Sequence, residues 1–259
     1  SKPLIIKLFN FGVKNLNPMF RSNAIYNSFA FDSFMTIKST IIKTCFLLTL
    51  LLGTATCIST YFPMLSMNIE LLICLVLVGV IIILITNFYP KFSIVSAPSI
   101  SIIQGILVGS ISLRYALISW DFIFTAVVGT CAILFSVSFL YITKIIKVGH
   151  KLISIISTLT SGVLIFYMLI WILKLFGVSL PYLHEANPLT LVLSLVIVLV
   201  ATLTLLADFR YIEYMAEHNL AKHMEWYAAL SLLVTIVWLY VELLRLSRIV
   251  YLILIGRQH

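Results

Sequence analysis

Ionisable side chains that lie inside long apolar stretches are the residues of this sequence best suited to chemistry. Lys43, Asp208, Glu242 and Arg245 all lie within such stretches. A charged side chain at the centre of a bilayer costs about 2.5–3.5 kcal/mol on insertion scales, so each one requires a compensating partner or a function. Carboxylates in this setting can carry protons or bind cations, which makes Asp208 and Glu242 candidate ion or proton sites.

Lys43 and Asp208 are predicted to lie at the same depth, each about one helical turn inside the same membrane boundary. We predict that they form an ion pair, because a lysine and an aspartate that face inward relieve each other's desolvation. Such a pair would hold Asp208 ionised and make the protein insensitive to mild acidification. Two simpler interpretations remain open: the Lys43 side chain extends to the headgroups, and Asp208 lies in water at the boundary.

Glu242 and Arg245 are three residues apart in the last apolar stretch, and therefore on one face of a helix. We predict that Glu242 lies inside the bundle or beside Arg245 and does not face acyl chains, because a lone carboxylate in lipid has no compensating partner. A local pair of these two residues near the outer membrane boundary is the plainer alternative to an ion site.

Other reactive residue types give no clear site. Glu213 and Glu217 have helical i,i+4 spacing and could bind a divalent cation, although a solvated loop explains them more simply. The four cysteines lie in apolar stretches without C-x-x-C spacing, which indicates packing residues and neither a metal site nor a disulfide. Neither H-E-x-x-H nor G-x-S-x-G is present, so we expect no enzymatic activity and no cofactor, with Ca²⁺ kept as a candidate ligand.

Composition requires lipid to be the solvent for most of the chain. Of 259 residues, 62% are hydrophobic and 10% are charged, whereas soluble domains have about 45–50% and about 25%. The net charge of +8 is typical of cytoplasmic loops that face anionic headgroups. We expect the lipid bilayer as a partner and no nucleic acid, because the basic residues form no patch.

Seven apolar stretches are long enough to cross the hydrocarbon core as helices, which need about 17–25 residues. They lie at residues 40–62, 67–88, 93–113, 121–143, 152–176, 188–209 and 225–248. Helices satisfy their own backbone groups in lipid, and the alternation typical of a β-barrel is missing from the sequence. We therefore expect an all-α integral membrane protein, with a basic N-terminal segment at 1–39 (cytoplasmic or interfacial), a seven-helix domain at 40–250 and a short tail at 251–259.

Basic residues predict the orientation of this bundle. With a cytoplasmic N-terminus, the connections place eleven Lys and Arg residues inside and five outside, as the positive-inside rule requires. Arg245, Arg248 and Arg257 near the C-terminus oppose this count. Either the tail is an exception to the rule or the last helix does not fully cross, so the side of the C-terminus stays open.

Gly105 and Gly109 form a small-xxx-small pattern in the third stretch. This spacing lets two helix backbones approach closely, and the neighbouring helix can belong to the same bundle or to a second copy. Chance is the alternative in a chain rich in small residues. The pattern therefore predicts helix packing and no particular oligomeric state.

The C-terminal third carries the most specific sequence pattern. Residues 207–213 (ADFRYIE), 224–227 (MEWY) and 233–246 (LVTIVWLYVELLRL) resemble the transmembrane Bax inhibitor motif family. Within that family the chain looks closest to the bacterial branch often called Bax-inhibitor-like or YccA-type. Further similarity to this branch lies at Asn17-Pro18, Met35-Thr36, Lys43-Thr44, Ala97-Pro98 and Ser112. The resemblance covers residues 17–248.

The resemblance implies a seven-helix bundle with the last helix near the centre, in a cell (inner) membrane or in an organellar one. Some members of the family are pH-sensitive calcium leaks that use two aspartates, on the sixth and seventh helices, which share a proton. Others bind and modulate membrane partners, including a membrane-anchored AAA protease. Both kinds of function are therefore expectations for this chain.

Asp208 matches the first aspartate of that pair, but the second falls on Thr235. A threonine hydroxyl can donate a hydrogen bond to Asp208 and cannot share a proton as an acid would. Glu242 lies about 10 Å further along the helix and cannot replace the missing aspartate. Gln104 likewise stands where this branch often has a glutamate. We therefore expect a membrane partner or regulator, with a pH-sensitive Ca²⁺/H⁺ leak or exchanger through Asp208 and Glu242 as the alternative.

Overall fold

The computed structural model describes residues 34–64, 68–145, 148–176 and 187–256. Within these ranges the chain forms seven long helices and one 3₁₀ turn: α2 (Ile37–Tyr61), α4 (Ile69–Phe88), η3 (Pro90–Phe92), α5 (Ser93–Ala116), α6 (Asp121–Ile142), α7 (His150–Leu175), α8 (Pro188–Glu217) and α9 (Met224–Gly256). All seven long helices are long and apolar enough to span a membrane. The predicted all-α membrane bundle is confirmed, whereas residues 1–33 of the predicted N-terminal segment lie outside the described residues.

The observed helices differ from the predicted stretches by three residues or more at four ends, one of which is the end of α5 at Ala116 rather than 113. α2 begins at Ile37 rather than 40, because Thr36 caps it: the Thr36 hydroxyl accepts a hydrogen bond from the Ser39 backbone N–H over 3.3 Å. α8 continues to Glu217 rather than 209, and α9 continues to Gly256 rather than 248, into the segment predicted as a tail. Charged residues ended the apolar stretches in the sequence, but a helix can continue beyond the hydrocarbon.

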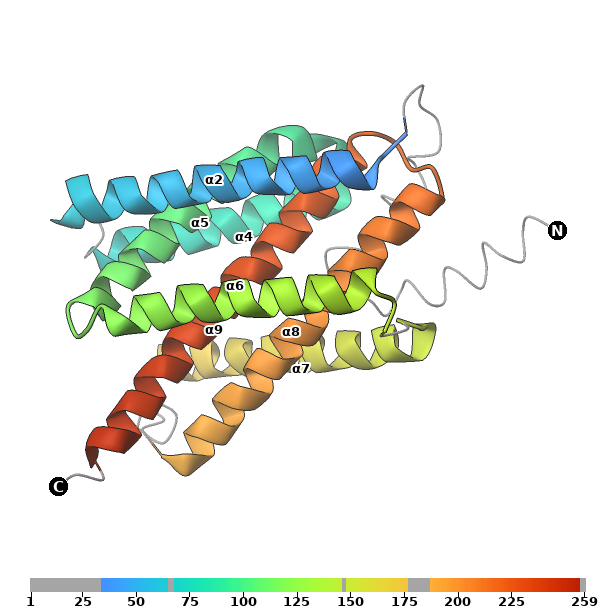
Figure 1. Cartoon of the computed structure of the whole chain (residues 1–259). Helices are drawn as coiled ribbons and strands as arrows, with labels where there is room; N and C mark the ends of the chain where they lie inside the picture. Colours follow the sequence, from blue (N-terminus) through green and yellow to red (C-terminus); the bar gives the residue numbers. More distant parts are fainter. Residues whose placement is uncertain (1–33, 65–67, 146–147, 177–186, 257–259) are drawn as a thin grey trace.

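The two longest helices are the last two. α8 has 30 residues and α9 has 33. At 1.5 Å per residue they extend about 45 and about 50 Å, well beyond a hydrocarbon core about 30 Å thick. Both run diagonally to α2 and α6 in Figure 1. Tilt and extension past the hydrocarbon therefore accommodate their length.

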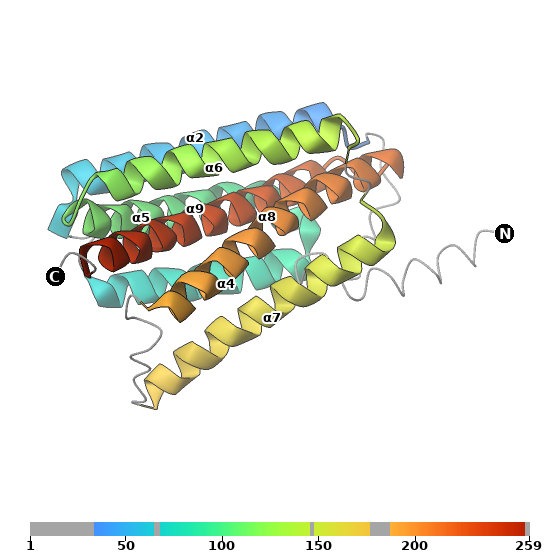
Figure 2. The same cartoon turned by 60° about the horizontal axis from the view of Figure 1, so that its bottom comes forward.

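α9 is the central helix of the bundle. In its most apolar stretch 67% of the residues are buried, compared with 44% or less in every other described span. α9 packs against α2, α5, α6 and α8. Figures 1 and 2 show this arrangement from two directions. The expectation that the last helix lies near the centre is therefore confirmed, and polar residues on α9 are those with the least access to lipid and water.

α2 and α5 cross closely through a row of small residues. The Ser101 hydroxyl donates to the backbone oxygen of Leu47 over 2.6 Å. A Cβ atom added to Gly105 would lie 2.6 Å from the backbone oxygen of Leu51, and one added to Gly109 would lie 2.5 Å from that of Ala55. No side chain fits at either glycine. The small-xxx-small pattern is therefore a helix contact inside the bundle.

The outward faces of the helices are apolar, as lipid contact requires. All four cysteines lie on this outer surface: Cys45, Cys57, Cys74 and Cys131 are exposed. Their interpretation as packing residues was therefore wrong. Cysteine is apolar enough to face acyl chains, so an apolar setting in the sequence does not distinguish the inside of a membrane bundle from its outside.

One end of the bundle collects the beginnings of α2, α5, α7 and α9 and the ends of α4, α6 and α8 (right side of Figures 1 and 2). We call it the Lys43 face. Here the Met35 N–H donates to the Leu220 oxygen over 2.8 Å, and the Ser93 hydroxyl donates to the His223 oxygen over 3.1 Å. Asn219, with a φ of 52°, ends α8 in a tight turn. The short α8–α9 connection therefore lies against the beginnings of α2 and α5.

Candidate functional site

Three carboxylates are deeply buried in the described part of the bundle. Asp208 of α8 is 2% exposed, and Glu225 and Glu242 of α9 are 1% and 4% exposed. A buried carboxylate is costly unless it is paired or hydrogen-bonded. The partners of each one therefore indicate what it can do.

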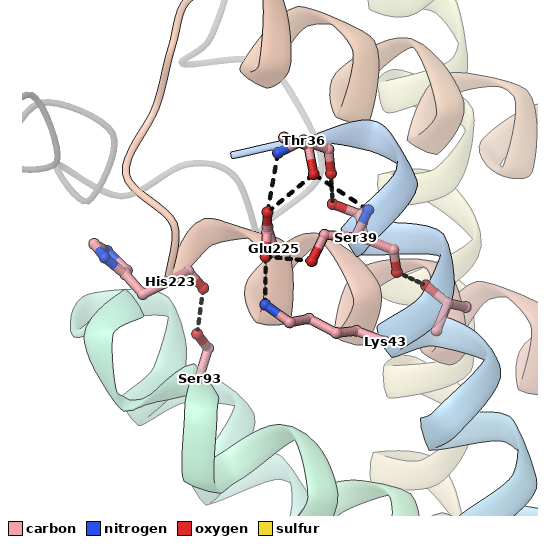
Figure 3. A network of polar contacts seen from close by, with 8 residues as sticks. Thr36, Ser39, Lys43, Ser93, His223 and Glu225 are labelled. Carbon is pink, nitrogen blue, oxygen red and sulfur yellow. Dashed lines mark hydrogen bonds and ion pairs between the residues drawn. The ribbon is translucent and has the colours of Figure 1, made fainter. Parts of the chain in front are cut away.

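Glu225 lies in the first turn of α9 and forms a buried ion pair with Lys43 of α2 (Figure 3). The same carboxylate accepts hydrogen bonds from the Ser39 hydroxyl over 2.8 Å and from the Thr36 N–H over 3.0 Å. The Lys43 amine also lies 5.0 Å from the centre of the Trp226 ring, within the range of a cation–π contact. This cluster joins the beginning of the first described helix to the beginning of the last.

Lys43 therefore pairs with Glu225 and not with Asp208, so the predicted ion pair was wrong. The observed partner is favoured by its place, because a carboxylate in the first turn of a helix is stabilised by the helix dipole. The sequence interpretation assigned Glu225 to a solvated connection, whereas the residue is almost fully buried. The sequence alone does not show that α2 packs against α9. This packing brings Lys43 to that turn.

Within the described part of the chain, Asp208 has hydroxyl partners and no cation. The Thr235 hydroxyl donates to one carboxylate oxygen over 2.5 Å, and the Ser231 hydroxyl donates to the other over 3.2 Å. The predicted hydrogen bond from Thr235 is confirmed. Among the described residues, no Lys, Arg or His nitrogen lies within 4.0 Å of this carboxylate. Asp208 is thus the buried acid of this region without a compensating charge.

A small cavity of about 10 Å³ adjoins Asp208 between α7 and α8. Apolar atoms make up most of its lining, which includes Ile153, Ile156 and Ala207 together with Asp208 and four residues with hydroxyl groups: Ser157, Thr160, Thr204 and Tyr211. The hydroxyls of Thr160 and Thr204 lie 2.8 Å apart and connect the two helices. The carboxylate therefore has hydroxyl partners on the α9 side and a small, mostly apolar cavity on the α7 side.

Glu242 has a cationic partner and two hydrogen-bond donors. Its carboxylate lies 3.2 Å from an Arg245 guanidinium nitrogen and accepts hydrogen bonds from the Tyr167 hydroxyl over 2.5 Å and from the Trp238 indole over 3.3 Å. Arg245 in turn donates to the Tyr167 oxygen over 2.7 Å and to the Ser194 hydroxyl over 3.4 Å. The predicted place inside the bundle beside Arg245 is confirmed, and the network joins α9 to both α7 and α8.

Glu213 and Glu217 end α8 at the Lys43 face, around Arg210. The Arg210 guanidinium lies 2.6 Å from Glu213 and 3.7 Å from Glu217, and the Tyr141 hydroxyl donates to Glu213. Among the residues that the structure describes, no group of three or more His, Cys, Asp or Glu side chains could hold a metal ion. The two glutamates therefore form ion pairs with Arg210 in this structure.

His223 belongs to the α8–α9 connection and is partly buried. Burial and the nearby positive charge of Lys91 both lower the pKa of the imidazole below its ordinary value of 6.5. The neutral form of His223 is therefore favoured at the Lys43 face, beside the ion pair of Lys43 and Glu225.

Sequence reasoning missed several residues of these clusters. Tyr167 carries no charge and lies in an apolar stretch, so nothing in its own type singles it out. Ser231 could have been predicted from the sequence, since it precedes Thr235 by four residues and so shares its helix face. Glu225 could also have been predicted, because an acid at the start of an apolar helix is typical of a stabilised helix N-terminus.

Comparison with known protein families agrees with the sequence pattern. A family model described as Bax inhibitor 1 like matches residues 17–251. No curated protein and no solved structure matches the chain. The match confirms the predicted family across the seven described spans, while the YccA-type branch stays a prediction. The chain belongs to the Bax inhibitor 1 like family of multi-pass membrane proteins.

Proposed function

We propose that this chain acts as a membrane-embedded partner or regulator of another membrane protein, without enzymatic activity of its own. One observation carries the proposal: the α9 neighbour of Asp208 is the Thr235 hydroxyl, at 2.5 Å, in place of a second carboxylate. A proton shared between acids requires two titratable groups. Ca²⁺ takes six to eight oxygen ligands, usually including several carboxylates. Asp208 with neutral hydroxyls supplies neither.

The position of Glu242 supports the same conclusion. This second candidate acid is held by Arg245 at 3.2 Å and by Tyr167 at 2.5 Å. Removing the Arg245 contact would leave a buried carboxylate without its cation, which is strongly unfavourable. Glu242 is therefore suited to holding three helices together and poorly suited to releasing its partner for a passing ion.

Calcium flux into liposomes as a function of pH tests the proposal. The purified protein is reconstituted around a calcium indicator, beside Asp208→Asn and beside Thr235→Asp, which restores the second acid. We expect the wild type to match Asp208→Asn and protein-free liposomes at every pH, with an ionophore as the positive control. A wild-type flux that changes steeply between neutral and mildly acidic pH and vanishes in Asp208→Asn would overturn the proposal.

That outcome would support the second candidate function, a pH-sensitive cation leak or exchanger. The observation in its favour is the absence of a cation partner for the buried Asp208 among the described residues, next to a small cavity. A buried acid of this kind can change its charge state. In this alternative Asp208 acts without Glu242, because Arg245 already compensates the latter.

The partner that we propose is a membrane-anchored AAA protease in the cell (inner) membrane. This rests on the family resemblance and has a direct test. The chain and the protease are reconstituted together, and the rate of ATP-dependent degradation of a membrane substrate is measured with increasing amounts of the chain. A saturable change in rate is expected. A rate that stays constant up to a large excess of the chain would exclude this partner.

We also propose a cytoplasmic N-terminus, so that the Lys43 face is the cytoplasmic face. The basic residues support this orientation, since Lys38, Lys91, Lys144 and Lys151 all belong to that face. In a background with the native cysteines replaced by serine, Lys144→Cys should react with an impermeant maleimide from the cytoplasmic side. Leu117→Cys, at the opposite end of α5, should react from the other side. Labelling of both positions from one side would contradict the topology.

A further inference from the structure

We infer that the end of the bundle opposite the Lys43 face binds the headgroup of an anionic phospholipid, through the Arg248 guanidinium and the hydroxyls of Tyr115 and Tyr251. Tyr115 belongs to the end of α5, and the other two residues belong to the last part of α9. This end of the bundle is on the left side of Figures 1 and 2. The inference does not depend on the proposed function, because a lipid can bind to a regulator and to a channel alike.

The first observation is that Arg248 has no carboxylate partner. With a cytoplasmic N-terminus, Arg245 and Arg248 both oppose the positive-inside rule. Arg245 is paired with Glu242 at 3.2 Å. Arg248 is exposed, and within the described residues no carboxylate oxygen lies within 4.0 Å of its guanidinium. Its partner must therefore come from water or from the membrane.

The depth of Arg248 matches that of lipid headgroups. At 1.5 Å per residue, Tyr115 lies about 33 Å from the beginning of α5, and Arg248 lies about 36 Å from the beginning of α9. The hydrocarbon core is about 30 Å thick. Trp120 and Tyr61 at the same end of the bundle are exposed, as is typical of the aromatic belt at a membrane–water boundary. Arg248 therefore lies where the phosphate groups of one leaflet begin.

An aromatic junction holds the three donors together. The rings of Tyr115 and Phe122 lie 6.3 Å apart, and those of Phe122 and Tyr251 lie 5.1 Å apart, both in edge-to-face contact. Phe122 of α6 is 3% exposed, so the junction is packed and not a chance surface contact. The Arg248 guanidinium lies 6.0 Å from the centre of the Tyr115 ring, at the limit of a cation–π contact. Packing of α5, α6 and α9 therefore places one guanidinium beside two phenols.

Phosphate oxygens match the donors of this junction. Among the residues that the structure describes, the hydroxyls of Tyr115 and Tyr251 form no hydrogen bond. A guanidinium can bind a phosphate through two parallel N–H donors, and each phenol can donate one more hydrogen bond. Asp121, the acid at the start of α6, instead accepts a hydrogen bond from the Ser119 hydroxyl over 3.0 Å. The junction therefore offers donors to an anion and has no acid of its own in contact with Arg248.

An anionic phospholipid supplies a phosphate at this depth. Basic sites between transmembrane helices bind such headgroups. A zwitterionic headgroup carries an ammonium group of its own, which competes with Arg248 for the phosphate. Towards the membrane interior, Phe124 and Val128 of α6 are exposed and provide the apolar surface that acyl chains need. We therefore expect phosphatidylglycerol to bind more tightly than phosphatidylcholine or inorganic phosphate.

Thermal unfolding with added lipid tests the inference. The purified protein in detergent is titrated with phosphatidylglycerol, phosphatidylcholine or inorganic phosphate at constant ionic strength. A ligand of the folded state raises the midpoint progressively above its Kd, and we expect this rise for phosphatidylglycerol. Arg248→Gln should raise the Kd roughly ten-fold, because it removes hydrogen bonds to a charged group. Lys151→Gln, with the same charge change at an exposed position of the Lys43 face, should keep the response.

Hydroxyl variants make the test specific to the junction. Tyr115→Phe and Tyr251→Phe keep the rings and remove only the hydroxyls, and each should raise the Kd roughly two-fold to ten-fold. Tyr61→Phe is the matched control, since Tyr61 is exposed at the same end of the bundle. In detergent without phospholipid, these variants and Arg248→Gln should unfold at the wild-type midpoint. A loss of stability already there would assign the residues to the fold and count against a lipid site.

Three other outcomes would overturn the inference. Equal midpoints in the two lipids would mean that water or an acidic segment of another protein is the partner of Arg248. Equal losses for Arg248→Gln and Lys151→Gln would mean attraction to the overall charge. An equal response to inorganic phosphate would mean that a free ion fills the site. None of these results bears on the calcium-flux test, so the two proposals can fail separately.

Discussion

Asp208 and Glu242 are buried to nearly the same extent in one bundle, but the side chains that surround them differ. Glu242 contacts a guanidinium, a phenol and an indole, so its charge is compensated by side chains of the protein. Asp208 contacts two hydroxyls and adjoins a small, mostly apolar cavity. Burial and residue type are therefore insufficient to identify a functional acid in a membrane. The missing cation partner is what distinguishes Asp208.

Glu225 belongs with Glu242 in this comparison. It too has a basic partner, Lys43, and it joins two helices at one end of the bundle as Glu242 joins three further along α9. Removing the basic partner of a buried pair should destabilise the fold, whereas neutralising Asp208 should not.

The largest effect is expected for Lys43→Met. This variant leaves the almost fully buried Glu225 carboxylate without its cation, and breaking a buried pair costs about 3–5 kcal/mol. The Lys43 side chain is 16% exposed, so we expect the lower end, about 3 kcal/mol. The free energy of unfolding is measured in detergent by denaturant titration.

Two further variants decide whether the comparison holds. Lys38→Met, at an exposed position of the same helix, should leave stability nearly unchanged. Asp208→Asn should cause no loss or a small gain, because it removes a charge that no side chain among the described residues compensates. If Asp208→Asn proved as damaging as Lys43→Met, the distinction between compensated and uncompensated acids would be lost.

Arg245→Leu should have the next largest effect, about 2 kcal/mol, because it leaves Glu242 buried with a phenol and an indole as neutral partners. The loss should be smaller than for Lys43→Met, since the Arg245 side chain is 31% exposed. Arg248→Leu, exposed on the same helix, is the matched control. In the double variant with Glu242→Gln most of the loss should disappear. A fully additive double variant would show that the two residues do not act as a pair.

The smallest effect concerns the pH dependence from His223. The pKa of His223 is lower in the folded protein than its ordinary value of 6.5, so the unfolded chain binds more protons below that value. Stability should therefore fall as the pH decreases through about 6.5 towards the folded pKa, by at most about 1.4 kcal/mol per pH unit, and should be unaffected above it.

Unfolding midpoints at neutral and mildly acidic pH measure this effect. His223→Gln should flatten the curve, whereas His218→Gln, at an exposed position, should not. Identical curves for the wild type and His223→Gln would mean that another group produces the acid response.

The fold was largely predictable from the sequence, and the pairing of its charges was not. Lipid imposes helices on every long apolar stretch, so the spans at 69–88 and 121–142 follow from composition alone. The pair of Glu242 and Arg245 was also predictable, because both lie on one helix. Lys43 and Glu225 lie on different helices, and their contact depends on which helices are neighbours. One sequence gives the depth of each charge along its helix and leaves the direction it faces undetermined.

The ion pair of Lys43 and Glu225 can form only after most of the chain has been synthesised. Its two residues are 182 positions apart, and a ribosome adds about 5–20 residues per second, so roughly 10–35 s separate their synthesis. During that interval the first span sits in the membrane with a lysine whose partner does not yet exist. The nascent chain must keep Lys43 near the headgroups or beside an insertion factor until α9 arrives. In a chain interrupted before α9, Lys43 would permanently lack its partner. A membrane quality-control protease that recognises exposed charge would then identify this chain as incomplete.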